Sequence, residues 1–322
     1  MSHYLTVNDQ SSNLIRIENT VKEIMKHDGA IQLFKCIPDS KIRFDHQFYL
    51  KLQKKLPQYL SIYRSGYEYS EHIRAFWEAC FELKLLYPDE IYQNSLFQRL
   101  KLGMSTTLQL VEAIKLETQT QRFRRAAIDR RYQMEQNRKQ LYQHVEDVLD
   151  EYTRTLVVRV DLKYRKDTHR FLDIDQVYRD FEHFKRQIHL RKGIFTNLIN
   201  YVWCIEQGGR EGGYHLHTAY FFEGSKHRCD YYLGQSIGEL WQDVTRGSGW
   251  FSNRNTSKNK AWLDARGMLG VGMMYRCDER LDTVRAAIGY LAKPEKEGQY
   301  LRMKPRGRRT FGKGERLLLR ST

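Results

Sequence analysis

Apolar residues recur at helical spacing through the first half of the chain. Four of them in NLIRIENTVKEIMKHDG fall on one face of a helix: Leu14, Ile17, Val21 and Ile24. Gly29 supplies an end to this helix. Three further amphipathic ranges follow, the last of them weaker: 45–60, 70–86 and 98–116. The pattern predicts an all-helical N-terminal region over residues 1–150.

One long polar helix is expected at the end of this region, over residues 118–149. Its apolar positions are sparse, so we expect it to project or to bridge rather than to form core. Its arginines can lie along DNA or form a solvated face, and the sequence leaves both readings open. Together these helices make residues 1–150 a candidate DNA-binding or accessory domain.

The period changes at Thr155, where TLVVRVDLKY alternates between two faces as a strand does. A helix over 175–191 follows, then two strand-like runs, YVWCIEQ and YHLHTAYFF, around GGREGG. A helix over 231–244, a strand over 268–275 and a helix over 279–292, capped by Asp278, complete the order. Residues 151–322 are thus predicted to form an α+β domain, an antiparallel sheet with helices on one face and a basic C-terminal arm.

Composition narrows the class of protein. The chain has 54 Lys and Arg against 39 Asp and Glu, and a net charge of +15 favours a polyanionic partner such as nucleic acid. The 5 cysteines are scattered without CxxC spacing, which argues against a disulfide framework or a Cys-rich zinc site. The polar N-terminus and the lack of a long apolar run predict a cytoplasmic protein without a membrane partner.

Two histidines with a nearby carboxylate form a candidate metal site. His215 and His217 lie two apart on one strand, so their side chains leave the same face. If residues 208–213 close a hairpin, Glu206 lies directly opposite His215, roughly 4.5–5.5 Å away at Cβ. Two imidazoles and a carboxylate suit Mn²⁺ or Mg²⁺ when phosphate oxygens complete the shell, and the same set suits Zn²⁺. A slip of one residue would turn Glu206 away.

A tyrosine on a later helix is a candidate nucleophile. Tyr290 and Lys293 stand three apart in DTVRAAIGYLAKPE, so both can address one point. A phenol attacks phosphorus poorly unless a neighbouring cation or a metal assists it. In the structural alternative, Tyr290 simply packs with Val284, Ala287 and Leu291.

Basic residues in several segments are candidate phosphate contacts. We expect seven to bind DNA: Arg159, Arg254, Lys258, Lys260, Arg306, Arg308 and Arg309. Trp250, Phe251 and Trp262 stand among them in RGSGWFSNRNTSKNKAW, where aromatic rings can stack on unpaired bases or fill a small core. The core role is the stronger expectation for Trp262, and the C-terminal segment reads as a flexible arm or a solvated tail.

Three ordered motifs resemble those of HUH-type rolling-circle replication initiators: LVVRVDLKY, HLH and YLAK. YHLHTAYFFEGSK and AIGYLAKPEK look closest to the inovirus-type replication protein family, also called the YagK/YfjJ C-terminal domain. The resemblance covers about residues 151–310 and implies a five-stranded, ferredoxin-like sheet. It also implies a divalent metal on His215 and His217, with Tyr290 as the single nucleophile and Lys293 as its helper. Some initiators carry two tyrosines in this helix, which leaves open how the strand is closed.

The expected activity is a metal-dependent nick in single-stranded or origin DNA that starts rolling-circle replication of a phage, prophage or satellite element. Host helicase and polymerase are the further expected partners, because the chain has no GxxxxGK[ST] motif of its own. Two alternatives stay open. One is a DNA-binding regulator with a non-catalytic HUH-like domain, and the other is a mobilisation relaxase or transposase-like enzyme.

Overall fold

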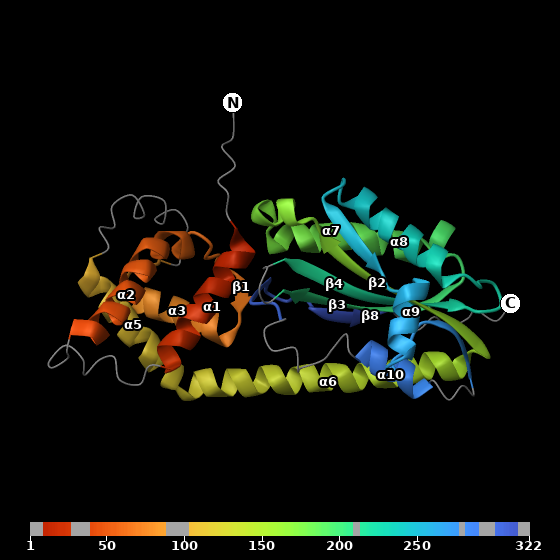
Figure 1. Ribbon diagram of the computed structural model, residues 1–322, viewed down its shortest axis with the longest axis horizontal. Helices are drawn as coiled ribbons and strands as arrows, with labels where there is room; N and C mark the ends of the chain where they lie inside the picture. The colour runs from red at the N-terminus through yellow and green to blue at the C-terminus, as the bar shows by residue number, and fades with distance from the viewer. Residues whose placement is uncertain are drawn as a thin grey trace, which may run out of the picture. The chain divides into compact units, whose positions relative to one another are not determined.

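The computed structural model describes residues 9–26, 39–87, 103–208, 213–276, 281–289 and 300–314. The chain forms two compact units, whose elements are labelled in Figure 1. The first unit comprises Met1–Arg130 with Arg302–Gly307, and the second comprises Arg131–Leu301 with Arg308–Thr322. This division differs from the expected boundary at residue 150, because one helix contributes to both units and a C-terminal segment belongs to the first.

The first unit is mainly helical, as predicted. Its described helices are α1 (Gln10–Lys26), α2 (Asp39–Leu60), α3 (Glu71–Glu82), α5 (Met104–Gln119) and the start of α6 (Gln121–Glu151). The apolar positions expected to face the core of α1 are buried: Leu14, Ile17, Val21 and Ile24. The hydrophobic period therefore identified the packed face of this helix correctly.

The prediction of an all-helical N-terminal region is wrong at one point. Strand β1 (Tyr67–Tyr69) pairs antiparallel with β7 (Met303–Pro305), which lies far away in the sequence. Beside this pair, Arg302 forms a buried ion pair with Glu18 of α1. Strands of three residues carry too little periodicity to be recognised, and their partner is set by tertiary contacts.

The long helix α6 is present, but the expectation that it stays out of the core is wrong for its second half. Four of its residues belong to the core of the second unit: Leu141, Val145, Val148 and Leu149. Their spacing places them on one face of the helix. A narrow apolar stripe on a very polar helix is thus enough to bury one side of it.

The second unit is built around a six-stranded sheet, whereas the family resemblance implied about five strands. Its members are β2 (Arg154–Tyr164), β3 (Leu198–Gln207), β4 (Tyr214–Glu223), β5 (Gly249–Asn253), β6 (Gly272–Tyr275) and β8 (Phe311–Lys313). The order is β5-β2-β4-β3-β8, with β6 also paired to β2, and every pair is antiparallel. The α+β class with an antiparallel sheet is therefore confirmed.

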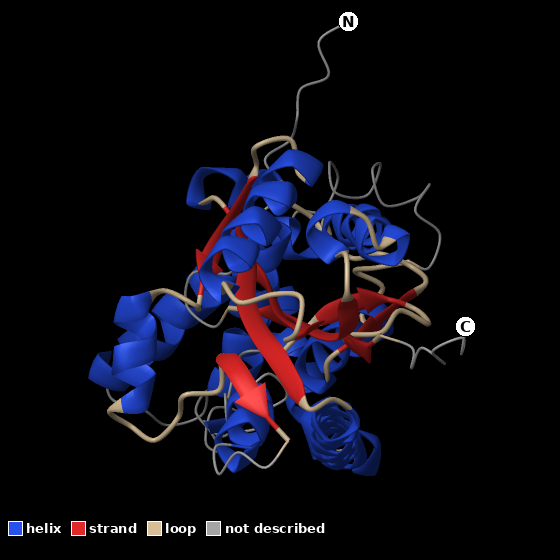
Figure 2. Cartoon of the chain, turned by 90° about the vertical axis from the view of Figure 1, so that its right-hand side faces the viewer, coloured by secondary structure: helices blue, strands red, loops and turns tan. Residues whose placement is uncertain are grey.

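Helices cover both faces of this sheet rather than the one face that was predicted (Figure 2). On one side lie α7 (Ile174–Leu190) and α8 (Asp230–Val244), where Phe181 packs on Trp203 and Trp241 on Tyr164. On the other side, α6 and α10 (Leu281–Gly289) share a core cluster with the sheet. This double cover explains why β2 is buried at almost every position, although its sequence alternates.

Two further predictions concern segments near the C-terminus. The expected flexible arm is wrong for residues 303–305 and 311–313, which form strands β7 and β8. The cap Asp278 and the range beyond Gly289 of the predicted helix lie outside the described residues.

A short helix, α9 (Ser257–Asp264), was not predicted. None of the described helices is both long and apolar enough to cross a membrane.

Candidate functional site

The hairpin of β3 and β4 has the register that the sequence predicts. Glu206 pairs with His215 and Gln207 pairs with Tyr214. The backbone N–H of Gly208 donates to the carbonyl of Gly213, 2.8 Å away, which closes the hairpin. Glu206, His215 and His217 therefore project from one face of the sheet.

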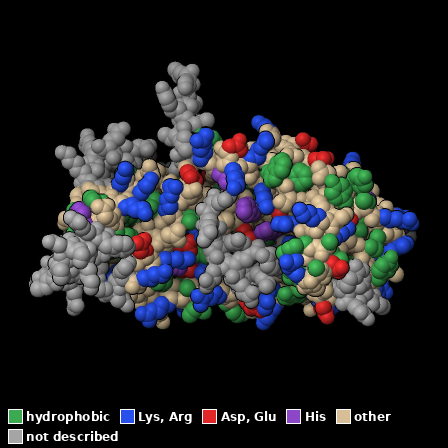
Figure 3. All heavy atoms as spheres, in the orientation of Figure 1, with side chains coloured by type: hydrophobic (Ala, Val, Ile, Leu, Met, Phe, Trp, Pro, Cys, Tyr) green, Lys and Arg blue, Asp and Glu red, His purple; other side chains and the backbone are tan. Residues whose placement is uncertain are grey.

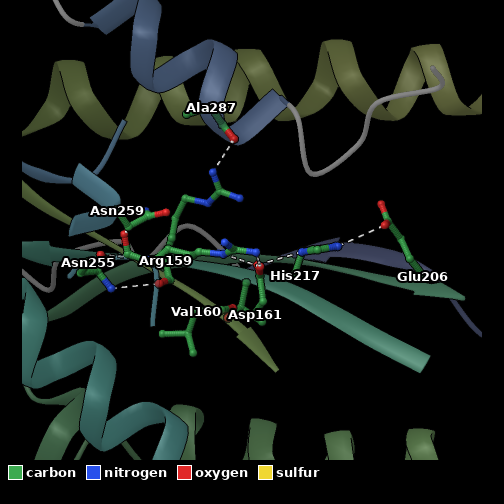
Figure 4. A network of polar contacts seen from close by, with 10 residues as sticks. Arg159, Val160, Asp161, Glu206, His217, Asn255, Asn259 and Ala287 are labelled. Atoms are coloured by element: carbon green, nitrogen blue, oxygen red, sulfur yellow. Dashed lines mark hydrogen bonds and ion pairs between the residues drawn. The ribbon is translucent and has the colours of Figure 1, made fainter. Parts of the chain in front are cut away.

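His217 holds the centre of a buried polar network on this face. Its Nδ1 lies 2.8 Å from Oδ1 of Asp161 on β2, and its Nε2 lies 3.1 Å from Oε2 of Glu206 (Figure 4). Asp161 is only 1% exposed and His217 only 9%. The far oxygen of Asp161 accepts a hydrogen bond from Nε of Arg254, 2.6 Å away. An imidazole between two carboxylates is held in one orientation.

The electrostatics of the two histidines differ. Burial alone would lower the pKa of His217, but Asp161 and Glu206 outweigh it and raise this pKa above the ordinary value. Burial also acts against the charge of Asp161, yet His217 and the two nearby arginines hold the pKa of this carboxyl well below its usual range. For His215, burial and the positive charges of His217 and Lys163 lower the pKa to about 4. His215 is therefore a neutral imidazole near pH 7.

The motif resemblance implies a divalent cation on His215 and His217. Among the described residues, no three His, Cys, Asp or Glu side chains stand in an arrangement that holds a metal ion. The structure does bring Glu206 and His217 into contact and places His215 on their face. The 3.1 Å between Nε2 and Oε2 is a hydrogen-bond and ion-pair contact.

Asp161 contacts the other ring nitrogen of His217. Metal-binding histidines usually donate their other ring N–H to a carboxylate, which sets the tautomer and strengthens the ligand. Asp161 occupies this position behind His217. A divalent cation on Glu206, His215 and His217, with Asp161 as the orienting carboxylate, therefore stays a prediction, because the described residues do not form a three-ligand arrangement.

Arg159, expected to contact DNA, has a different place. It is 8% exposed, and its Nη1 donates to the carbonyl oxygen of Ala287 in α10, 3.1 Å away. Figure 4 shows its side chain reaching from β2 to that helix. The predicted phosphate contact of Arg159 therefore stays a prediction. In this structure the arginine ties the end of α10 to the strand that carries Asp161.

Tyr290 and Lys293 lie outside the described residues, so their predicted roles stay predictions. In the sequence Tyr290 directly follows the last residue of α10, three positions after Ala287. The backbone that leads to the tyrosine is therefore anchored beside the histidine network.

A family model described as the YagK/YfjJ C-terminal domain matches residues 116–313. The chain belongs to this family. The match begins before the expected start near residue 151 and includes α6, which agrees with the place of α6 in the core of the second unit. Comparison with curated proteins found no match, and neither did comparison with solved structures.

Within this YagK/YfjJ C-terminal domain, the remaining candidate DNA contacts vary in exposure. Lys258 is exposed, whereas Lys260 pairs with Asp230 at 2.8 Å and Arg254 with Asp161. Arg308 and Arg309 are exposed, and Nη1 of Arg308 lies 3.1 Å from Glu182. Arg306 is exposed too, but it belongs to the first unit. Figure 3 shows Lys and Arg side chains over much of the visible described surface.

Sequence reasoning assigned no role to Asp161, although the sequence carried a signal for it. A carboxylate inside a strand must find partners when the strand is buried on both faces. Here His217 and Arg254 provide them. The core role expected for Trp262 is wrong, because its side chain is 51% exposed on α9.

Proposed function

We propose that this chain is a metal-dependent single-strand DNA endonuclease of the HUH type that starts rolling-circle replication of a mobile element. The observation that supports the proposal is that Glu206, His215 and His217 lie on one face of the sheet, with Glu206 and Asp161 both in contact with His217. A bound cation would draw charge from the scissile phosphate.

Tyr290, Lys293 and Arg159 have separate roles in the proposed reaction. The phenolic oxygen of Tyr290 attacks phosphorus, the bond from phosphorus to the 3′ oxygen breaks, and that oxygen takes up a proton equivalent to the one the phenol loses. The products are a 5′-phosphotyrosine ester and a free 3′-hydroxyl, and no oxidant or reductant is needed. Lys293 stabilises the phenolate, and Arg159 positions the helix that precedes Tyr290 through its bond to Ala287.

The test is covalent capture of single-stranded origin-like DNA in the presence of Mn²⁺. Wild-type protein should form an adduct stable to denaturing electrophoresis, and Tyr290→Phe should form none. His217→Ala should abolish the adduct while sparing DNA binding. His189→Ala is the matched control, because His189 lies on α7 and contacts the hydroxyl of Tyr201 at 3.1 Å.

His215→Ala guards against a folding artefact, since His215 is only half-buried. Its circular dichroism should match that of wild type while cleavage is lost. A wild-type protein that binds single-stranded DNA but never forms an adduct would sink the nuclease proposal.

One observation favours a second candidate, a DNA-binding regulator with a non-catalytic domain. Both ring nitrogens of His217 face a carboxylate, so the network is satisfied without a cation. Mn²⁺ titration separates the two candidates. A regulator should bind DNA equally well with and without Mn²⁺, and its calorimetric trace should show no metal binding that depends on His217.

A further inference from the structure

The strand register extends the histidine face outward to the edge of the sheet. Trp250 of β5 pairs with Lys163 of β2. Lys163 follows Leu162, which pairs with Leu216, so the register continues from Lys163 to His215. His215 in turn pairs with Glu206. Because paired residues share a face, one row runs from Trp250 through Lys163 to the candidate metal ligands.

The indole of Trp250 is not needed for the core of the sheet. Its neighbour Phe251 points to the other face, where its ring packs closely against Gly238 of α8. Trp250 is 52% exposed, although it is the largest kind of apolar side chain. One exposed aromatic residue needs no explanation by itself, but this one stands in a row with a lysine and a candidate active site.

The charge around Trp250 is of the sign that a nucleic acid strand requires. Lys163 forms no ion pair with any residue that the structure describes, and it is half-exposed. The nearby carboxylates are already engaged, since Asp161 binds Arg254 and His217, and Glu206 contacts His217. A positive charge beside an open aromatic ring is the combination that binds unpaired nucleotides.

We propose that Trp250 and Lys163 bind single-stranded DNA beside the cleavage site. The indole stacks on an unpaired base, and the ammonium of Lys163 contacts an adjacent phosphate, so that the strand is led toward His215. Duplex DNA is a poor occupant, because its bases are already stacked on one another. The inference deepens the proposed function and rests on it for the direction of the strand.

Binding is measured with a fluorescein-labelled degenerate pool of single-stranded DNA oligonucleotides, by anisotropy, in EDTA. Trp250→Ala should weaken binding about 5- to 150-fold, the worth of one stacked base. Trp250→Phe keeps a ring and should retain most of the affinity. Tyr232→Ala is the control: Tyr232 is also an exposed aromatic residue of the same unit, but it lies on α8, which covers the other face of the sheet.

Salt dependence separates the two contacts. Lys163→Gln should reduce the slope of log affinity against log salt by about 0.7, as expected for one lost phosphate contact on a single strand. Trp250→Ala should leave that slope unchanged, because stacking releases no counterion. An unchanged slope for Lys163→Gln overturns the phosphate contact.

The stacking claim fails if Trp250→Ala binds as tightly as wild type, if Tyr232→Ala loses as much affinity, or if duplex binding depends equally on Trp250. Because EDTA removes divalent cations, these results are independent of cleavage. Loss of adduct in Tyr290→Phe with normal binding by Trp250→Ala leaves the proposed function and removes this inference. Conversely, if single-stranded DNA binding depends on Trp250 but the protein never forms an adduct, this inference stands and the nuclease proposal falls.

Discussion

Replacing Asp161 by asparagine removes the buried charge that orients His217 without changing the size of the side chain. The hydrogen bond to His217 involves a charged group and is worth about 1.5–3 kcal/mol. The ion pair with Arg254 adds less, about 0–1 kcal/mol, because that arginine is partly exposed. We therefore expect Asp161→Asn to lower the free energy of unfolding by about 1.5–4 kcal/mol.

The functional effect should exceed this loss of stability. Removing the carboxylate behind a metal-binding histidine typically costs 10- to 100-fold in metal affinity. Mn²⁺ affinity is measured by calorimetry, and unfolding by urea titration with tryptophan fluorescence. In metal-free protein, the pKa of His217 should also fall, because Asp161 is the main group that raises it against burial. An NMR titration of the histidine ring follows that shift.

Asp180→Asn is the matched control. Asp180 is also buried, but it lies on α7, where it accepts from the hydroxyl of Tyr164 at 2.9 Å and the amide of Gln176 at 2.7 Å. Its partners are neutral, so its replacement should cost less and should leave Mn²⁺ affinity unchanged. If Asp161→Asn binds Mn²⁺ as tightly as wild type does, or if Asp180→Asn loses as much affinity, the orienting role of Asp161 is refuted.

Three other substitutions test the packing of α8 against β5, the ion pair between Glu71 and Arg130, and the bond from Arg159 to α10. Gly238→Ala places a Cβ about 2.1 Å from the ring of Phe251. The resulting overpacking, about 1–3 kcal/mol, should exceed the gain in helix propensity and lower the Tm. Adding Phe251→Leu to this variant should restore the Tm. Burial alone raises the pKa of Glu71, but His72 and Arg130 outweigh it and hold this pKa below 4.5. Glu71→Gln should therefore cost about 3 kcal/mol at pH 7, and in urea titrations the difference from wild type should shrink as the pH falls below about 4.5. Arg159→Met should slow adduct formation at unchanged Mn²⁺ affinity, because it frees only the last turn of α10. If the rate of adduct formation and the Mn²⁺ affinity fall equally, the positioning of α10 by Arg159 is contradicted.

Much of the local structure was readable from periodicity. The helix that carries Leu14 and the hairpin that pairs Glu206 with His215 were predicted at the right residues. Both depend on short-range patterns, a 3.6-residue period in one case and a closed hairpin in the other. The bond between Gly208 and Gly213 shows that the glycine-rich connection kept the simplest register.

What the sequence by itself determined is therefore the class of fold and the face on which the two histidines stand. Only the tertiary structure decided which charges meet there, because Asp161 and Arg159 come from a strand that ends more than 30 residues before the hairpin. Burial between two helical layers also gave Arg159 a hydrogen bond to α10 that its place in the sequence did not predict. A side chain's alternation along a strand tells which way it points, but the element that covers it is supplied by distant parts of the chain.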